Sequence, residues 1–328
     1  MAPHGGLSFA GLLDRTFSAI SRTWTTSLAL GAVLLIPSSI LFGFAYGKFL
    51  DVLKDLGSLT PSAGAASLVP FGLAYLWIVL AVLAHGVVFL FVRACVTEHT
   101  ARSLRGESPR TLEIAAHVIS RLYGPLLGQR LLQAAIIVLT VGGVSLVVGV
   151  VIGILAAVKA ALLAAVLGGL LMIAGMCVVM WISIRYSVTL EAMVVDGSGI
   201  ERSLDRSMEL VKGRWWRVFG YTLLFGLMVS FASSLVATPI MFFSTLRQFI
   251  HNLQAVLQQA PDPRQLNRTL LLLFSGMGRR LGILQYVQGL ASAFVTPVFM
   301  TLLFLDLKEP RQPPTGAVEP AAGGEPRP

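Results

Sequence analysis

The stretch from Leu131 to Ile184 carries a single formal charge, at Lys159. As one helix with a rise of about 1.5 Å per residue it would be roughly 80 Å long, more than twice the roughly 30 Å hydrocarbon core of a bilayer. The chain must therefore fold back within this stretch. Lys159 marks the expected turn, although no Gly or Pro stands there. The stretch predicts two consecutive membrane spans.

The remainder of the chain has the composition of a membrane protein. Of its 328 residues 55% are hydrophobic and 12% are charged, against about 25% charged in soluble proteins. Four further apolar runs are long enough to span a bilayer, namely Thr26–Gly47, Ser67–Val96, Val218–Phe243 and Leu281–Leu305. The sequence therefore predicts an all-α membrane protein with six transmembrane helices, in one polytopic membrane domain over residues 1–308.

Basic residues set the expected orientation, because positively charged loops stay cytoplasmic during insertion. Most of the 25 Lys and Arg residues fall on the cytoplasmic side if the N-terminus is cytoplasmic, and both termini are then cytoplasmic. The net charge of +9 is expected to attract anionic lipid headgroups. Arginines spread over membrane-flanking segments argue against nucleic acid as a partner. Residues 309–328, rich in Pro, Gly and Ala, predict a disordered cytoplasmic tail.

Similar segments precede the odd-numbered spans. LDRTFSAISRTW begins at Leu13, LEIAAHVISRLY at Leu112, and LDRSMELVKGRWW, one residue longer, at Leu204. They predict three repeats, each a cytoplasmic amphipathic interfacial helix followed by a transmembrane helical hairpin. The repeat boundaries are 8–97, 107–190 and 198–307. Arg22, Arg121 and Arg214 are then expected at one membrane level.

The third copy shows the amphipathic pattern most clearly. Apolar residues recur every three or four positions from Ile200 to Trp215, which places them on one face of a helix. Such a helix is expected to lie in the membrane interface. Ser198 and Glu201 have the spacing of a capping box at its start.

Tryptophan prefers the headgroup level, and arginine can reach phosphate from there. The basic and aromatic residues of the three copies are therefore candidate lipid contacts. They are Arg22, Trp24, Arg121, Tyr123, Arg206, Lys212, Arg214, Trp215, Trp216 and Arg217.

Ionisable groups at membrane depth are candidates for function because they are costly there. His85 lies near the middle of the second span, while Arg185 and Glu191 lie close to helix ends, as do Gln129, Arg130 and Gln133. A neutral His85 hydrogen-bonded to a neighbouring helix is favoured over a proton relay. No other His, Asp or Glu lies within a turn of His85, and no HExxH, GxSxG, P-loop or CxxC pattern occurs. The sequence thus predicts no metal site, cofactor or catalytic residue.

Small residues recur every fourth position around Gly149 and Gly153, which predicts a close helix contact, either within the protein or between subunits. Pro37, Pro239 and Pro297 fall inside predicted spans and are expected to kink them.

Three motifs occur along the chain: the N-terminal L-x-x-x-LDRTF, the central VVDGSGIERSLDRSMELVKGRWWRVFG and the final TPVFMTLLFLDLKEP. Together they resemble bacterial integral membrane proteins related to the membrane domain of glycerophosphoryl diester phosphodiesterase. The resemblance implies that Glu191, the Arg206–Arg217 core, Pro297 and Asp306 are characteristic positions. Hydrolytic members add a soluble catalytic domain, and the residues after Asp306 are too few for one. The resemblance therefore implies architecture more than activity.

Three functions are compatible with these features. The first is a non-enzymatic protein of the bacterial inner membrane, a scaffold that contacts anionic lipids and a membrane-protein partner or a second copy of itself. The second is a transporter or permease subunit built around His85, Arg185, Glu191 and the prolines. The third, a membrane component associated with lipid-diester hydrolysis, rests on the resemblance alone.

Overall fold

The computed structural model describes residues 7–57, 68–157, 160–258 and 277–309. All regular secondary structure in these residues is helical, and six of their helices are long and apolar enough to cross a membrane. The prediction of an all-α protein with six transmembrane helices is therefore confirmed. The long helices are α1 (Phe9–Gly57), α2 (Leu68–Leu104), α4 (Tyr123–Ala157), α5 (Ala161–Arg185), α8 (Trp215–Gln258) and α10 (Met277–Lys308).

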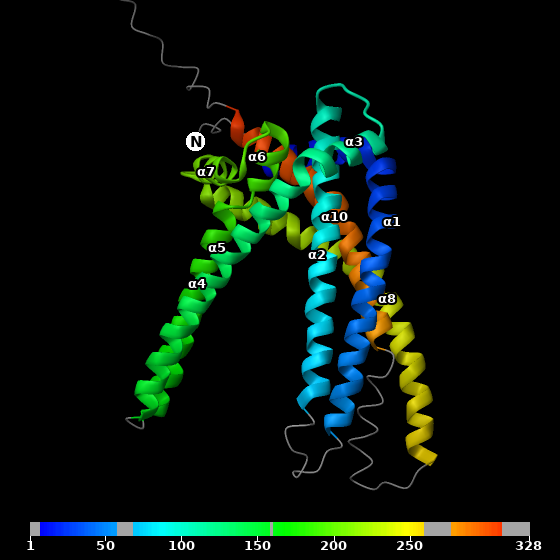
Figure 1. Ribbon diagram of the computed structural model, residues 1–328, viewed down its shortest axis with the longest axis vertical. Coiled ribbons are helices and arrows are strands. Elements are labelled where there is room, and N and C mark those ends of the chain that lie inside the picture. The colour runs from blue at the N-terminus through cyan, green and yellow to red at the C-terminus, as the bar shows by residue number, and fades with distance from the viewer. Residues whose placement is uncertain (1–6, 58–67, 158–159, 259–276, 310–328) are drawn as a thin grey trace, which may run out of the picture.

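Shorter helices gather at one end of the molecule, together with the start of α1 (Figure 1). We call this the polar end. Its helices are α3 (Thr111–His117), the π-helix η2 (Val118–Leu122), α6 (Thr189–Asp196) and α7 (Ile200–Val211). The end of α4 and the start of α5 lie at the opposite end (Figure 1). Because α4 ends at Ala157 and α5 begins at Ala161, the chain reverses where the length argument predicts. Of the predicted tail, residues 309–328, all but Glu309 lie outside the described residues.

The core forms where α1 packs along α10 and α2. A Cβ at Gly282 of α10 would lie 2.9 Å from the Ser39 carbonyl oxygen and 3.1 Å from the Gly43 Cα of α1. Glycine therefore lets the two backbones touch, which gains van der Waals contact along the pair. Toward the polar end Phe299 is fully buried, and its ring stacks on Phe225 of α8 with centroids 3.9 Å apart.

The hairpin formed by α4 and α5 diverges from the other long helices with distance from the polar end (Figure 1, green). Its apolar side chains stay exposed along most of its length, with Leu139 75% and Leu162 82% exposed. Where a soluble protein would bury such side chains, a bilayer can cover them with lipid. The hairpin is thus built for a membrane and not for a water-facing surface.

Small residues join α4 to α5, but they are not the predicted ones. A Cβ at Gly175 would overlap Val144 Cγ1, and one at Gly168 would lie 2.9 Å from a methyl carbon of Ile152. Nothing lies within 4 Å of a Cβ built at Gly149 or Gly153, and both are exposed. The predicted glycine pair therefore lies outside the intramolecular contact.

The segments predicted as interfacial helices differ from one another. Leu13–Trp24 is the beginning of α1, since no Gly or Pro interrupts the helix there, and Leu112–Tyr123 passes through η2 into α4. Only the third segment is separate: α7 ends at Val211, and Gly213 with φ +75° precedes α8. Glycine tolerates this left-handed conformation without steric cost.

The apolar side of α7 faces protein. Leu204 and Val211 are buried on it, and Ser207 Oγ donates a hydrogen bond of 2.7 Å to the Arg185 carbonyl at the end of α5. This face is therefore not available to lipid. The predicted capping box is wrong, because Gly199 is the N-cap of α7 and Ser198 Oγ donates to the Ala192 carbonyl at 2.9 Å.

The three predicted kink sites all lie within helices. Pro37 is inside α1, Pro239 inside α8 and Pro297 inside α10. None of them ends its helix, as is common where a membrane protein re-satisfies the freed backbone groups.

The packing of α4 on α5 can be tested by adding a single methyl group at Gly175. We expect Gly175→Ala to lower the free energy of unfolding by about 1–3 kcal/mol, because the new methyl group overlaps Val144. Gly149→Ala is the matched control, since nothing lies near its Cβ. It should be neutral or stabilise the helix by up to about 1 kcal/mol. Unfolding in detergent, followed by circular dichroism, measures both. Equal effects of the two substitutions would contradict the helix contact.

Candidate functional site

A cluster of charged and amide side chains lies where the base of the α4–α5 hairpin meets α2 and α6. We call it the charged cluster; its members are Arg93, Gln129, Arg130, Gln133 and Glu191. Glu191, on α6, is completely buried, and its Oε1 lies 3.5 Å from Arg93 Nη2 of α2. This ion pair joins two helices that are distant in the sequence.

The amides of the cluster come from one side of α4. Gln129 Nε2 and Arg130 Nη1 both donate to Gln133 Oε1, at 3.2 and 2.8 Å, across spacings of four and three residues. Arg130 also lies within electrostatic range of Arg93 and Glu191. Two guanidinium groups thus share one carboxylate, so the cluster carries excess positive charge in a poorly hydrated place.

Three polar atoms of the charged cluster have no hydrogen-bond partner among the described residues. They are Arg93 Nε, Gln129 Oε1 and Glu191 Oε2, and all three are buried. Buried polar atoms in native proteins almost always bond to protein or to ordered water. The charged cluster therefore has hydrogen-bonding capacity left for water or a small polar ligand, in addition to holding α2, α4 and α6 together.

The sequence identified Glu191 as a candidate but missed its partner. Arg93 is the only Lys, Arg, Asp or Glu between Ser67 and Val96, so an arginine inside an otherwise uncharged span was a usable signal. The pairing of Arg93 with Glu191 needs the three-dimensional packing of α2 against α6, because 98 residues separate them.

His85 forms a second polar contact, between α1, α2 and α10. Its Nδ1 lies 3.0 Å from Ser38 Oγ, and its Nε2 lies 3.1 Å from Gln285 Nε2. Since Ser38 Oγ donates to the Leu35 carbonyl, the consistent assignment has Nδ1–H donating to Ser38 and Nε2 accepting from Gln285. This arrangement is the one expected of a neutral histidine that links helices.

Arg214 and Arg217, expected at the lipid surface, contact protein. Arg217 Nη2 lies 2.7 Å from Asp306 Oδ2 and donates to the Leu7 carbonyl at 2.7 Å, while Asp306 Oδ1 accepts the Leu7 amide at 2.8 Å. Arg214 Nη1 donates to the Leu307 carbonyl at 2.9 Å. These contacts tie the start of the chain to α8 and α10, so both arginines stabilise the fold at the polar end.

Some of the aromatic candidates are exposed, and others contact protein. Trp24 and Trp216 are 51% and 77% exposed. Trp215 instead stacks on Phe219 with centroids 5.2 Å apart, and its Nε1 donates to the Trp181 carbonyl at 3.4 Å. The remaining candidates are placed as follows: Tyr123 donates to the Val87 carbonyl at 2.9 Å, Arg185 lies 4.4 Å from the Trp181 ring centroid, Arg206 pairs with Glu209 at 3.3 Å, and Arg22, Arg121 and Lys212 are exposed.

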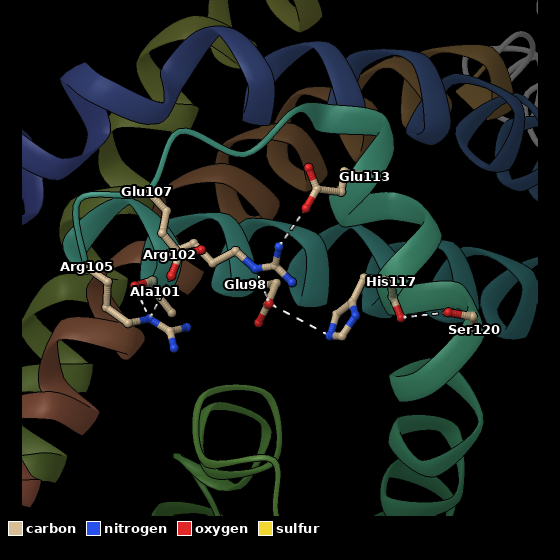
Figure 2. Close-up of polar contacts among 8 residues, drawn as sticks. All are labelled: Glu98, Ala101, Arg102, Arg105, Glu107, Glu113, His117 and Ser120. Carbon is tan, nitrogen blue, oxygen red and sulfur yellow. Dashed lines mark hydrogen bonds and ion pairs between the residues drawn. The ribbon is translucent and has the colours of Figure 1, made fainter.

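A third polar network, missed from the sequence, joins the end of α2 to α3 (Figure 2). Arg102 bridges Glu98, at 2.6 Å, and Glu113, at 3.2 Å, while His117 Nε2 lies 3.9 Å from Glu98. These contacts fix the connection between α2 and the helix that leads into α4. Among the described residues no group of three His, Cys, Asp or Glu side chains is arranged to hold a metal ion.

The Arg93–Glu191 pair has a distinctive expected response to mutation. Arg93→Met should cost about 3–5 kcal/mol of unfolding free energy, because it removes the ion pair of the buried Glu191 carboxylate and leaves only the more distant Arg130 to offset its charge. Arg93→Met/Glu191→Leu should recover most of that loss, since a buried pair can be replaced by apolar side chains at little cost. A double-mutant cycle of unfolding in mixed micelles measures the coupling. Purely additive effects would show that the two side chains do not interact.

Comparison with known proteins places this architecture in a family. The family model described as Domain of unknown function (DUF7847) matches residues 108–305, from the loop before α3 to the last turns of α10. No curated protein and no solved structure matches the chain. The match includes every member of the charged cluster except Arg93. The chain therefore belongs to the DUF7847 family, as a helical, multi-pass membrane protein.

Proposed function

We propose that this protein is a non-enzymatic scaffold of a bacterial inner membrane, with both termini cytoplasmic. In this proposal the α4–α5 hairpin receives another transmembrane helix, and the polar end contacts anionic lipid. The observation that carries the proposal is the exposure of the hairpin. In the most apolar part of the span Thr111–Leu155, which includes most of α4, the protein buries only 6% of the residues. The corresponding share for α10 is 61%.

The hairpin suits a second transmembrane helix because its outer face combines apolar and small side chains. Helix pairs in membranes associate through close backbone approach at small residues, since lipid and leucine are equally apolar. Gly149 and Gly153 are exposed on α4 with nothing within 4 Å of their Cβ positions. The charged cluster holds the base of the hairpin to α2 and α6, so the exposed face is presented in a defined orientation.

Lipid contact is supported by the basic residues at the polar end that make no ion pair with the described residues. Arg121 and Lys212 are exposed, and the exposed Trp216 lies on the first turn of α8, shortly after Lys212. A basic side chain near an anionic membrane surface contributes about 1 kcal/mol. The polar end is therefore expected to prefer anionic headgroups.

The hairpin proposal can be tested by self-association, with a second copy of the chain as the partner. We expect energy transfer between differently labelled full-length copies in liposomes, and we expect Gly149→Leu/Gly153→Leu to reduce it severalfold by blocking backbone approach. Gly72→Leu/Gly86→Leu is the matched control, because these exposed glycines of α2 also have open space around them. Equal energy transfer in both double variants would remove the glycine face from the proposal.

The lipid proposal is tested with thermal unfolding in nanodiscs. Phosphatidylglycerol should stabilise the protein relative to phosphatidylcholine, and Arg121→Gln/Lys212→Gln should remove up to about 2 kcal/mol of that difference. Arg217→Gln is the contrasting variant: it breaks the contact with Asp306 and should destabilise the protein equally in both lipids. A lipid preference unchanged by the double substitution would count against headgroup contact at these residues.

A further inference from the structure

A cavity of about 330 Å³ opens at the polar end, between the start of α1, the end of α2 and the end of α10. Its volume lies at the lower end of the range of small-ligand sites. Polar side chains from all three elements line it, chiefly Asp14, Arg15, Ser18 and Arg22 from α1, Thr100 from α2 and Glu309 just after α10. Neither the scaffold hairpin nor the charged cluster takes part in it.

The spacing on α1 explains why two arginines share this cavity. Arg15, Ser18 and Arg22 stand at intervals of three and four residues, so they lie on one face of the helix. Within the described residues neither arginine makes an ion pair, and both are exposed. Guanidinium groups bind phosphate through paired N–H donors. The face of α1 therefore offers donors suited to a phosphoryl group.

Thr100 adds a second, independent indication of a ligand. It lines the cavity from α2, its side chain is 0% exposed, and its Oγ1 has no hydrogen-bond partner among the described residues. A buried hydroxyl without a partner is uncommon in native proteins. A ligand in the cavity would supply the missing hydrogen bond.

The acidic residues of the lining restrict the kind of ligand. Asp306 is already engaged by Leu7 and Arg217, but Asp14 and Glu309 also line the cavity. A bare anion beside the arginines would be repelled by these carboxylates. A ligand that carries a positive group next to its phosphate would complement both the arginines and the carboxylates of the cavity.

The α1 residues of the cavity come shortly before the apolar part of that helix. The apolar part of α1 begins at Leu28, so Arg22 stands about 9 Å before it along the helix. We propose that this cavity binds a phosphate ester bearing an ammonium group, the chemistry shared by an ethanolamine phospholipid headgroup and by free phosphoethanolamine esters. Arg15 and Arg22 bind the phosphate, Thr100 hydrogen-bonds to the ester, and Asp14 and Glu309 face the ammonium group.

Calorimetric titration of the purified full-length protein in detergent tests this site. The probes are dihexanoyl phosphatidylethanolamine and the soluble glycerophosphoethanolamine. We expect saturable binding of the lipid probe, weakened at least tenfold by Arg15→Gln/Arg22→Gln. Arg110→Gln/Arg202→Gln removes the same charge from exposed positions outside the cavity and should leave the Kd unchanged. Equal binding of both probes would identify the free ester as sufficient, whereas binding of the lipid probe alone would identify the membrane lipid.

Two further variants test the Thr100 hydrogen bond and the role of the acidic residues separately from the arginines. Thr100→Val keeps the side-chain volume and should weaken binding severalfold, which provides a result even if the double arginine variant does not fold. Asp14→Asn/Glu309→Gln should remove the preference for phosphatidylethanolamine over dihexanoyl phosphatidylglycerol. The proposal is overturned if neither probe binds, or if the Arg15/Arg22 and Thr100 variants bind as tightly as the unmodified protein. Because Arg121 and Lys212 lie outside the cavity, this site and the general lipid preference can fail separately.

Discussion

The close contact between α1 and α10 is the interaction on which the rest of the structure depends. Gly282 lets the two backbones meet at Ser39 and Gly43. Next to this contact, Ser38 of α1 and Gln285 of α10 both form hydrogen bonds with His85. At the polar end the pair brings the first described residue of the chain onto the last turns of α10, 299 residues later. The proposed headgroup cavity lies between these two helices and α2, so it exists only because they pack.

The α4–α5 hairpin follows a different principle. It gains little from burial against the rest of the protein, and its helices contact each other through Gly168 and Gly175. Its attachment is polar: the charged cluster at its base joins α4 to α2 and α6. A polar anchor with an apolar surface that the described residues leave uncovered is what the proposed contact with another helix requires, because no hydrophobic force drives burial of that surface within a bilayer.

The arginines near the start of α8 show how one residue pattern can serve two purposes. Arg214 and Arg217 flank two tryptophans at the start of a span, a pattern typical of a headgroup contact. In the structure both bind protein groups, and Lys212 and Trp216 are the members left exposed. The pattern predicts a position at the membrane interface. Whether a carboxylate such as Asp306 lies within reach depends on α10, which is remote in the sequence. The apolar stripe of α7 has the same ambiguity, since lipid and protein accept the same side chains.

Hydropathy and length by themselves determined the helical class, the six long apolar helices and the turn beside Lys159, because a helix must match the thickness of the bilayer and satisfy its backbone hydrogen bonds internally. The sequence also singled out His85 and Glu191, since polar groups in apolar segments are conspicuous. Only the tertiary structure decided their partners and which glycines join helices. Those outcomes depend on the rotation and distance of each helix relative to its neighbours. A uniformly apolar helix has no amphipathic pattern from which its buried face could be predicted.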